Sequence, residues 1–162
     1  MPQIYVAAGG NVEPERYLQR ALSELARVFG PLTCSAWYRN RAVGFEGADF
    51  INLAVGFASE REVHALIQEL HRIELVCDRP RAAPKWAPRT MDLDLLLYGD
   101  LICQEPKLVL PRPDLLRRAY MLGPLAEIAP DLMHPTARLT IGELWARFDR
   151  DAHPLVAVAP GT

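Results

Sequence analysis

The stretch Met91–Asp100, MDLDLLLYGD, decides how the rest of the chain is interpreted. Its apolar residues alternate with two acids before a Gly-Asp turn, a pattern that predicts a strand over Met91–Tyr98. Because alternate side chains of a strand share a face, Asp92 and Asp94 are expected on the same face, with Cα atoms about 7 Å apart. The opposite, core-facing side is expected to hold Met91, Leu93, Leu95 and Leu97.

Upstream of this stretch, the sequence predicts two helices and three further strands. Apolar runs predict strands over Ile4–Ala8, Leu32–Tyr38 and Phe50–Phe57. Helical spacing predicts one helix between the first two strands and another before Pro80, where Ser59 and Glu62 match a capping box. The order strand, helix, strand, strand, helix, strand indicates an α+β protein of the ferredoxin-like βαββαβ class, with helices on one face of an antiparallel sheet.

The last third of the chain is expected to add a loop and two helices. A proline-bounded loop is predicted over 105–113 and a helix over Leu115–Ile128. A second capping box, Thr140 to Glu143, predicts the start of a short helix. The chain after His153 carries a weak pattern and is expected to be poorly specified.

Composition and charge exclude several classes of protein. The 162 residues fit a single domain, 1–162. With 18 basic and 20 acidic residues the net charge is -2, which disfavours a nucleic-acid partner, and no apolar run approaches the roughly 20 residues of a membrane span. The N-terminus lacks the basic region of a signal peptide, so we expect a cytoplasmic protein. Small buried cysteines in a reducing compartment are expected at Cys34, Cys77 and Cys103.

The acid pair and the loop before it together indicate phosphate chemistry. Two neighbouring carboxylates on an apolar strand repel each other unless cations bind between them, and hard oxygen ligands suit Mg²⁺ that also binds phosphate. The preceding loop holds Trp86 and the cations Arg79, Arg81, Lys85 and Arg89. Cations that hold phosphate beside acids that hold metal ions are what phosphoryl transfer requires. Ordinary solvated acids, and a basic loop that is solvated or contacts RNA weakly through Trp86, are the alternatives.

Two other motifs indicate little chemistry. Gly9-Gly10-Asn11 follows the first strand but lacks the pattern of a phosphate-binding loop. His64 and His71 could share a face of the second helix, but the sequence offers no evident third metal ligand for them.

The segment Lys85–Gly99, KWAPRTMDLDLLLYG, resembles the signature of the 6-hydroxymethyl-7,8-dihydropterin pyrophosphokinases of folate biosynthesis. The resemblance extends over about residues 4–135 and includes Tyr5–Asn11, Asp49–Asn52, Leu110–Pro113 and Pro124–Pro130. It implies a ferredoxin-like sheet that C-terminal elements extend to an α/β/α sandwich. It also implies that the terminal diphosphate of ATP passes to the hydroxymethyl group of the pterin, leaving AMP. We expect a monomer whose partners are these small molecules.

The resemblance further implies roles for individual residues. Asp92 and Asp94 would hold two Mg²⁺ ions across the triphosphate, and Arg79 and Arg89 would act as catalytic residues on the transferring group. The nucleotide side would be lined by Glu74, Arg81, Trp86, Lys107, Arg112 and Arg118. The pterin would contact Asn52, Tyr120 and the backbone from Asn40 to Val43.

The chain departs from the family pattern at several positions. The chain has Gly10 where the family usually has a serine, and Asp78 and Ala87 where it has glycines. It has Asn40-Arg41 where the family has Thr-Pro. Arg112 stands where the family usually has a histidine, and its permanently charged guanidinium can also donate hydrogen bonds to phosphate. A member that binds nucleotide or pterin without transfer is the alternative function, and an RNA-binding module is disfavoured because the central strands lack paired aromatic residues.

Overall fold

The computed structural model describes residues 1–41, 48–77 and 91–158. Its main sheet has six strands: five follow the order β5–β1–β4–β3–β8, and β2 pairs with β4 off this path. The strands are β1 (Gln3–Gly10), β2 (Thr33–Cys34), β3 (Trp37–Asn40), β4 (Phe50–Ala58), β5 (Asp92–Tyr98) and β8 (Val156–Val158). The four predicted strands lie in the ferredoxin-like order fourth, first, third, second, and all pair antiparallel. The predicted fold class is therefore confirmed.

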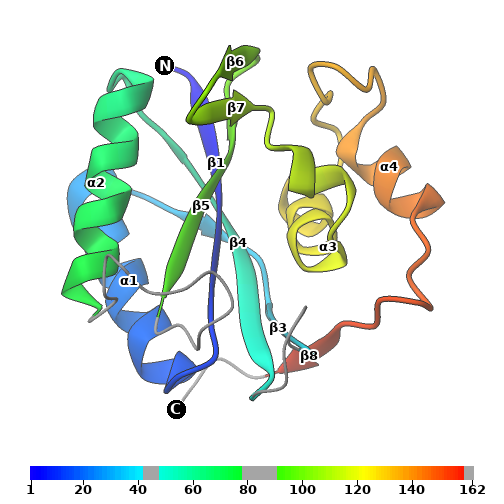
Figure 1. Cartoon of the computed structure of the whole chain (residues 1–162), viewed down its shortest axis with the longest axis horizontal. Coiled ribbons are helices and arrows are strands. Elements are labelled where there is room, and N and C mark those ends of the chain that lie inside the picture. The colour runs from blue at the N-terminus through cyan, green and yellow to red at the C-terminus, as the bar shows by residue number, and fades with distance from the viewer. Residues whose placement is uncertain (42–47, 78–90, 159–162) are drawn as a thin grey trace.

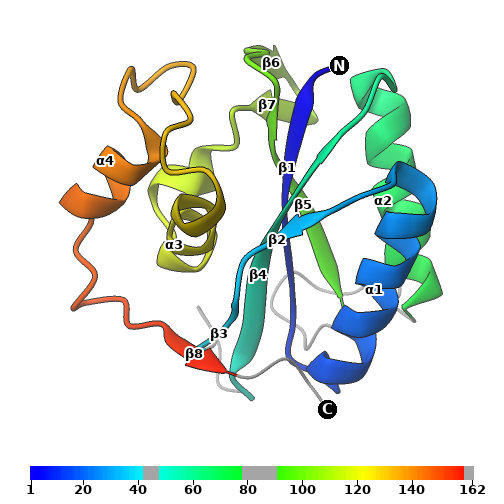
Figure 2. The same ribbon diagram turned by 180° about the vertical axis from the view of Figure 1, so that it is seen from behind.

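Helices cover both faces of this sheet (Figure 1). The helices α1 (Pro14–Phe29) and α2 (Val63–Val76) lie on one face, and α3 (Ala119–Ile128) and α4 (Ile141–Arg147) lie on the other, as the reverse view in Figure 2 also shows. Each helical layer closes its own apolar core. The first core includes Val6, Leu18 and Leu66, and the second includes Leu96, Leu122 and Ile141. This arrangement is the expected α/β/α sandwich.

The strand β5 alternates as predicted only over its first half. Leu95 pairs with Val6 but Leu97 pairs with Tyr5, so a bulge leaves Leu96 without a partner on β1. One inserted residue reverses the alternation of all that follow. Leu97 consequently lies with Leu96 in the core under α3. The prediction that Leu97 faces the same core as Leu95 is wrong.

The strand predicted over Leu32–Tyr38 is divided into β2 and β3 at Ser35. The backbone N–H of Ser35 donates to the carbonyl of Ala54 at 2.9 Å, and its hydroxyl accepts from the N–H of Ala54, also at 2.9 Å. The side chain thus replaces a backbone acceptor, and the chain can change direction while it stays attached to β4.

Only one of the two predicted capping boxes is present. At α4, Thr140 and Glu143 cap each other reciprocally, as predicted. At α2, the N-cap is Glu62, whose carboxylate accepts from two backbone N–H groups of the first turn. The hydroxyl of Ser59 instead accepts from the N–H of Arg61. The capping box predicted at Ser59 is wrong, because this residue belongs to the turn before the helix.

The last third of the chain contains more regular structure than the sequence indicated. The loop predicted over 105–113 contains β7 (Leu108–Leu110), which forms a separate hairpin with β6 (Cys103–Glu105). The helix predicted over Leu115–Ile128 begins as the 3-10 helix η1 (Pro113–Leu116), ahead of α3. The weakly specified tail supplies β8, which pairs with β3. Strands of three residues carry too short a pattern to be recognised from sequence.

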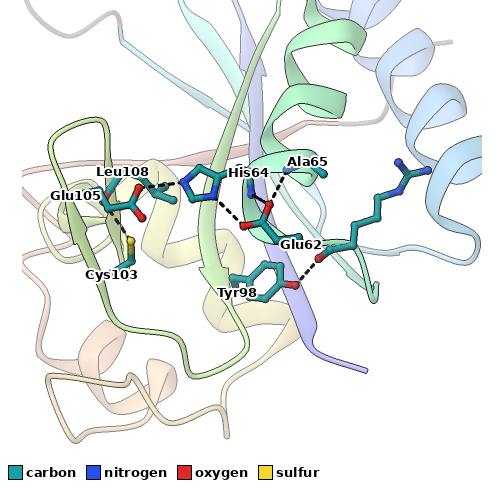
Figure 3. A network of polar contacts seen from close by, with 8 residues as sticks. Glu62, His64, Ala65, Tyr98, Cys103, Glu105 and Leu108 are labelled. Carbon is teal, nitrogen blue, oxygen red and sulfur yellow. Dashed lines mark hydrogen bonds and ion pairs between the residues drawn. The ribbon is translucent and has the colours of Figure 1, made fainter.

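Polar contacts attach the β6–β7 hairpin to the start of α2 (Figure 3). His64 Nδ1 lies 2.8 Å from Glu62 Oε1, and its Nε2 lies 2.9 Å from Glu105 Oε2. The hydrogen bond with Glu62, and to a smaller extent the one with Glu105, raises the pKa of His64. The hydroxyl of Tyr98 at the end of β5 donates to the carbonyl of Arg61. His64 therefore has a structural role at this end of the sheet.

The environments of the cysteines differ from one another. Cys77 is buried as predicted and Cys103 is half-buried, but Cys34 in the short strand β2 is exposed, so that part of the prediction is wrong. In the ranges that the structure describes, no helix combines the length and apolar character needed to cross a bilayer.

Candidate active site

Three neighbouring strands bring predicted pterin and metal residues to one face of the sheet. Gly9 of β1 is the direct cross-strand partner of Asn52 in β4 and of Asp92 in β5. Two residues earlier, Ala7 is in the same way the partner of Asp94. Direct partners on adjacent strands present their side chains on a common face. This face therefore carries an amide and two carboxylates on either side of a floor of small residues, which we call the Ala7–Gly9 floor.

The position of the Asn52 side chain requires glycine at Gly9. A Cβ atom at Gly9 would lie 1.9 Å from Asn52 Oδ1, far inside van der Waals contact. The amide of Asn52 therefore lies across β1, over the floor, rather than above its own strand.

A chain of hydrogen bonds fixes the orientation of this amide. Asn52 Nδ2 donates to Asn40 Oδ1 at 2.5 Å, and Asn40 Nδ2 donates to the carbonyl of Arg41 at 3.0 Å. Because a carbonyl can only accept, both amides are oriented, and Asn52 presents its oxygen over Gly9. The predicted pterin residues Asn40 and Asn52 are thus brought together, while Val43 lies outside the described residues.

Glu74 positions the strand that carries the acid pair. It is 7% exposed near the end of α2, and its Oε2 accepts from the backbone N–H of Leu93 at 2.8 Å. Leu93 lies between Asp92 and Asp94 on β5, which is an edge strand of the sheet formed by the described residues. Glu74 thus takes the place that a further strand would occupy there. The predicted contact of Glu74 with the nucleotide stays a prediction.

The segment between β7 and α3 brings further charges to the acid pair. The backbone N–H of Arg112 donates to the carbonyl of the bulged Leu96 at 3.0 Å, and its Nη2 lies 3.5 Å from Asp94 Oδ1. Its Nε lies 3.8 Å from Asp114 Oδ2. Sequence reasoning missed Asp114, because a single acid after Pro113 matches no motif and becomes notable only beside Arg112.

Tyr120, in the first turn of α3, belongs to the same group of residues. The pKa of its hydroxyl is raised, mainly by burial. The charges of Asp94 and Asp114 also raise this pKa, whereas those of Arg118 and Arg112 lower it. Tyr120 is therefore close enough to two acids and two cations to sense all four charges. The structure brings together three predicted ligand-binding residues, Arg112, Arg118 and Tyr120, beside the predicted metal ligand Asp94.

The remaining predicted residues do not join this group among the described residues. Lys107 lies at the exposed turn of the β6–β7 hairpin, beyond the end of β5 that is opposite to Asp92 (Figure 1). Its predicted contact with the nucleotide requires a ligand that extends along β5. Arg79, Arg81, Trp86 and Arg89 lie outside the described residues.

Comparisons with known proteins identify the family. Residues 5–130 match the family model described as 7,8-dihydro-6-hydroxymethylpterin-pyrophosphokinase (HPPK). The chain belongs to this family. It is 42% identical over 159 residues to a 2-amino-4-hydroxy-6-hydroxymethyldihydropteridine pyrophosphokinase of Synechocystis, covering 96% of this chain and 80% of that protein. An HPPK of Haemophilus influenzae is 34% identical over 148 residues, with 89% and 91% covered.

Solved structures share the fold of this HPPK chain. The crystal structure of wild-type Plasmodium falciparum HPPK-DHPS superposes with a TM-score of 0.68 at 13% identity, covering 91% of this chain and 41% of that one. The chain thus spans about two-fifths of that longer protein, and the similarity at this identity concerns the fold alone.

Membership in the HPPK family establishes the reaction. The chain is an ATP-dependent pyrophosphokinase that transfers the pyrophosphoryl group of ATP to hydroxymethyldihydropterin in folate biosynthesis. The function implied by the sequence resemblance is confirmed, and ATP and the pterin are its small-molecule substrates.

Proposed function

We propose that this chain carries out the transfer over the Ala7–Gly9 floor, between Asn52 and the Asp92–Asp94 pair. The observation that carries the proposal is the strand register, which makes Gly9 the direct partner of both Asn52 and Asp92. A flat pterin ring fits above Gly9, which has no side chain, beside the Asn52 amide, and a triphosphate fits beside carboxylates once cations neutralise its charge.

We propose further that Asp92 and Asp94 hold two Mg²⁺ ions. Both carboxylates are half-buried on a rigid strand, and the guanidinium of Arg112 already lies against Asp94, so this position attracts cations. Within the described ranges no three His, Cys, Asp or Glu side chains gather as a complete metal site. Mg²⁺ fits such a partial site, because it keeps several waters and takes phosphate oxygens as ligands. When bound, it would neutralise the charge on the phosphates.

The other side chains divide between the two substrates. Asn52 Oδ1 accepts an N–H of the pterin, Tyr120 stacks on its ring, and the backbone from Asn40 to Val43 completes the pterin pocket. Arg112 and Arg118 donate to phosphate oxygens. Arg79 and Arg89 stabilise the transferring group, and the nucleotide is further lined by Glu74, Arg81, Trp86 and Lys107. The hydroxymethyl oxygen gives up its proton to water and bonds to the β-phosphorus, as the bond from that phosphorus to the α-phosphate oxygen breaks and AMP leaves.

The two apolar cores share a single sheet, which supports one domain over 1–162. We propose that this domain acts as a monomer, and light scattering of the purified chain at catalytic concentrations tests that state.

The transfer is tested by identifying the nucleotide product. The purified chain is incubated with ATP, Mg²⁺ and hydroxymethyldihydropterin, and AMP and pterin diphosphate are quantified together. We expect equal amounts of the two products, and no AMP when the pterin or Mg²⁺ is omitted. Release of ADP would contradict diphosphate transfer, and tight binding of both substrates without AMP would favour the alternative of a binder that has lost transfer.

A further inference from the structure

Arg112 is held firmly by its backbone but loosely by its side chain. The backbone N–H is anchored to Leu96 at the β5 bulge, which directs the residue toward Asp94. Its contacts to Asp94 and Asp114, at 3.5 and 3.8 Å, are longer than the roughly 2.7–2.9 Å of a strong charge-assisted hydrogen bond. Its Nε is buried and donates no hydrogen bond within the described part of the chain.

Two consequences follow from this arrangement. A guanidinium beside Asp94 lowers the negative potential that draws a divalent cation to that carboxylate. A buried donor that lacks an acceptor gains from any ligand that supplies one. A triphosphate supplies several anionic oxygens, so it competes with Asp94 for the planar fork of Arg112.

We propose that Arg112 is a resident counter-ion of Asp94 in the nucleotide-free enzyme, and that this ion pair makes metal binding depend on nucleotide binding. This inference rests on the proposed metal role of Asp94. Without nucleotide, Arg112 opposes divalent cations at Asp94. With nucleotide bound, the guanidinium turns to phosphate and its charge no longer opposes the metal at Asp94. Arg112 is thus a positioning residue for the metal site as well as a phosphate ligand.

Metal affinity measured without turnover tests the proposal. Mn²⁺ serves as the probe, and free Mn²⁺ is measured by electron paramagnetic resonance with and without an ATP analogue that has a methylene group between the α- and β-phosphorus. The variants are Arg112→Gln, which removes the charge, Arg112→Lys, which keeps it, and Asp114→Asn, which removes the other carboxylate partner. Thermal melting of each variant monitors the fold.

The variants are expected to change the affinity for Mn²⁺ in opposite directions. Arg112→Gln should bind Mn²⁺ about tenfold more tightly than the parent without nucleotide, and Arg112→Lys should remain close to the parent. Asp114→Asn should bind Mn²⁺ about threefold more weakly, because the guanidinium then pairs with Asp94 alone. With the analogue, the advantage of Arg112→Gln should disappear. In Arg112→Gln, the factor by which bound nucleotide increases the affinity for Mn²⁺ should therefore be about tenfold smaller than in the parent.

The same measurements separate the ways in which the inference can fail. If Arg112→Gln binds Mn²⁺ no more tightly than the parent, while Asp94→Asn still weakens Mn²⁺ binding, Arg112 is not the counter-ion and only this inference falls. Should Arg112→Gln not fold, a loss of affinity in Arg112→Lys or an unchanged affinity in Asp114→Asn overturns it equally. If Asp94→Asn leaves Mn²⁺ binding unchanged even with the analogue, the metal role of Asp94 falls, and this inference falls with it.

Discussion

The two faces of the central sheet, built by the same strands, differ in the side chains they present. Toward α1 and α2, β1 and β4 present the buried apolar residues Val6, Ala8, Leu53 and Val55. Toward the opposite face, the alternate positions hold Ala7 and Gly9, Asn52 and Ala54, and β5 adds its two acids. The two-residue period of a strand thus separates folding from ligand binding. On the second face, Ala7 and Ala54 still belong to the core under α3. Substitutions on the first face should change stability, and those at Gly9, Asn52 and the two acids of β5 should change ligand binding.

The largest effect within this comparison is expected at Gly9. In Gly9→Ala the new Cβ displaces the Asn52 amide, which lies 1.9 Å from its position, so pterin affinity should fall by roughly 2–4 kcal/mol. Calorimetry of pterin binding measures the loss. In an Asn52→Ala background the same substitution should cost little more, because the displaced group is already absent. Additive losses would instead mean that Gly9 acts on the pterin independently of Asn52.

A smaller and selective effect is expected at Tyr120. Tyr120→Ala should weaken pterin binding by about 1–2 kcal/mol through the loss of ring stacking, and it should leave ATP affinity nearly unchanged. Tyr120→Phe keeps the ring and is the matched control, with pterin affinity close to that of the parent. Equal losses for both ligands in Tyr120→Ala would show that the ring supports α3 rather than the pterin.

The smallest effect is expected at His64, which lies away from the Ala7–Gly9 floor at the other end of β5. Because carboxylate partners raise its folded-state pKa, its stabilising contribution is complete below the unfolded pKa of roughly 6.5 and is lost as pH rises through the raised value. Hydrogen exchange of the β6–β7 amides, corrected for the intrinsic effect of pH, should therefore accelerate as pH rises above the unfolded pKa of roughly 6.5.

The matched variant for this prediction is His64→Gln. It should show no such pH dependence and should keep the pterin affinity of the parent. An unchanged pH dependence in His64→Gln would assign the effect to another group, and a loss of pterin affinity would contradict the separation between the hairpin and the site.

Local sequence pattern predicted those parts of the molecule that depend on short-range physics. The alternation in MDLDLLL placed Asp92 and Asp94 on one face, and Thr140 with Glu143 marked the start of α4. Leu97 could not be assigned correctly, because the bulge at Leu96 depends on pairing with β1, more than 80 residues earlier. The short strand β8 likewise exists only through its pairing with β3.

The candidate site shows the same limit. The resemblance predicts ligand contacts for Arg112, Asn52 and Tyr120, but it gave no contact between Arg112 and Asp94, which depends on the carbonyl freed at the bulge. The resemblance implied a nucleotide contact for Glu74, which stays a prediction, but it did not imply that Glu74 accepts from the backbone N–H of Leu93. Such contacts join elements far apart in the chain, and no local pattern encodes them.

The acid pair Asp92 and Asp94, on the ligand-binding face of the sheet, is proposed to carry the transfer. Its most direct test is the rate of AMP formation by Asp92→Ala and Asp94→Ala at saturating ATP, Mg²⁺ and pterin. Asp100→Ala, an acid in the turn after β5, is the control. Each of the first two variants should lose at least about 100-fold in rate while melting near the parent temperature, and the control should keep the parent rate. Near-parent rates in both Asp92→Ala and Asp94→Ala would contradict the account.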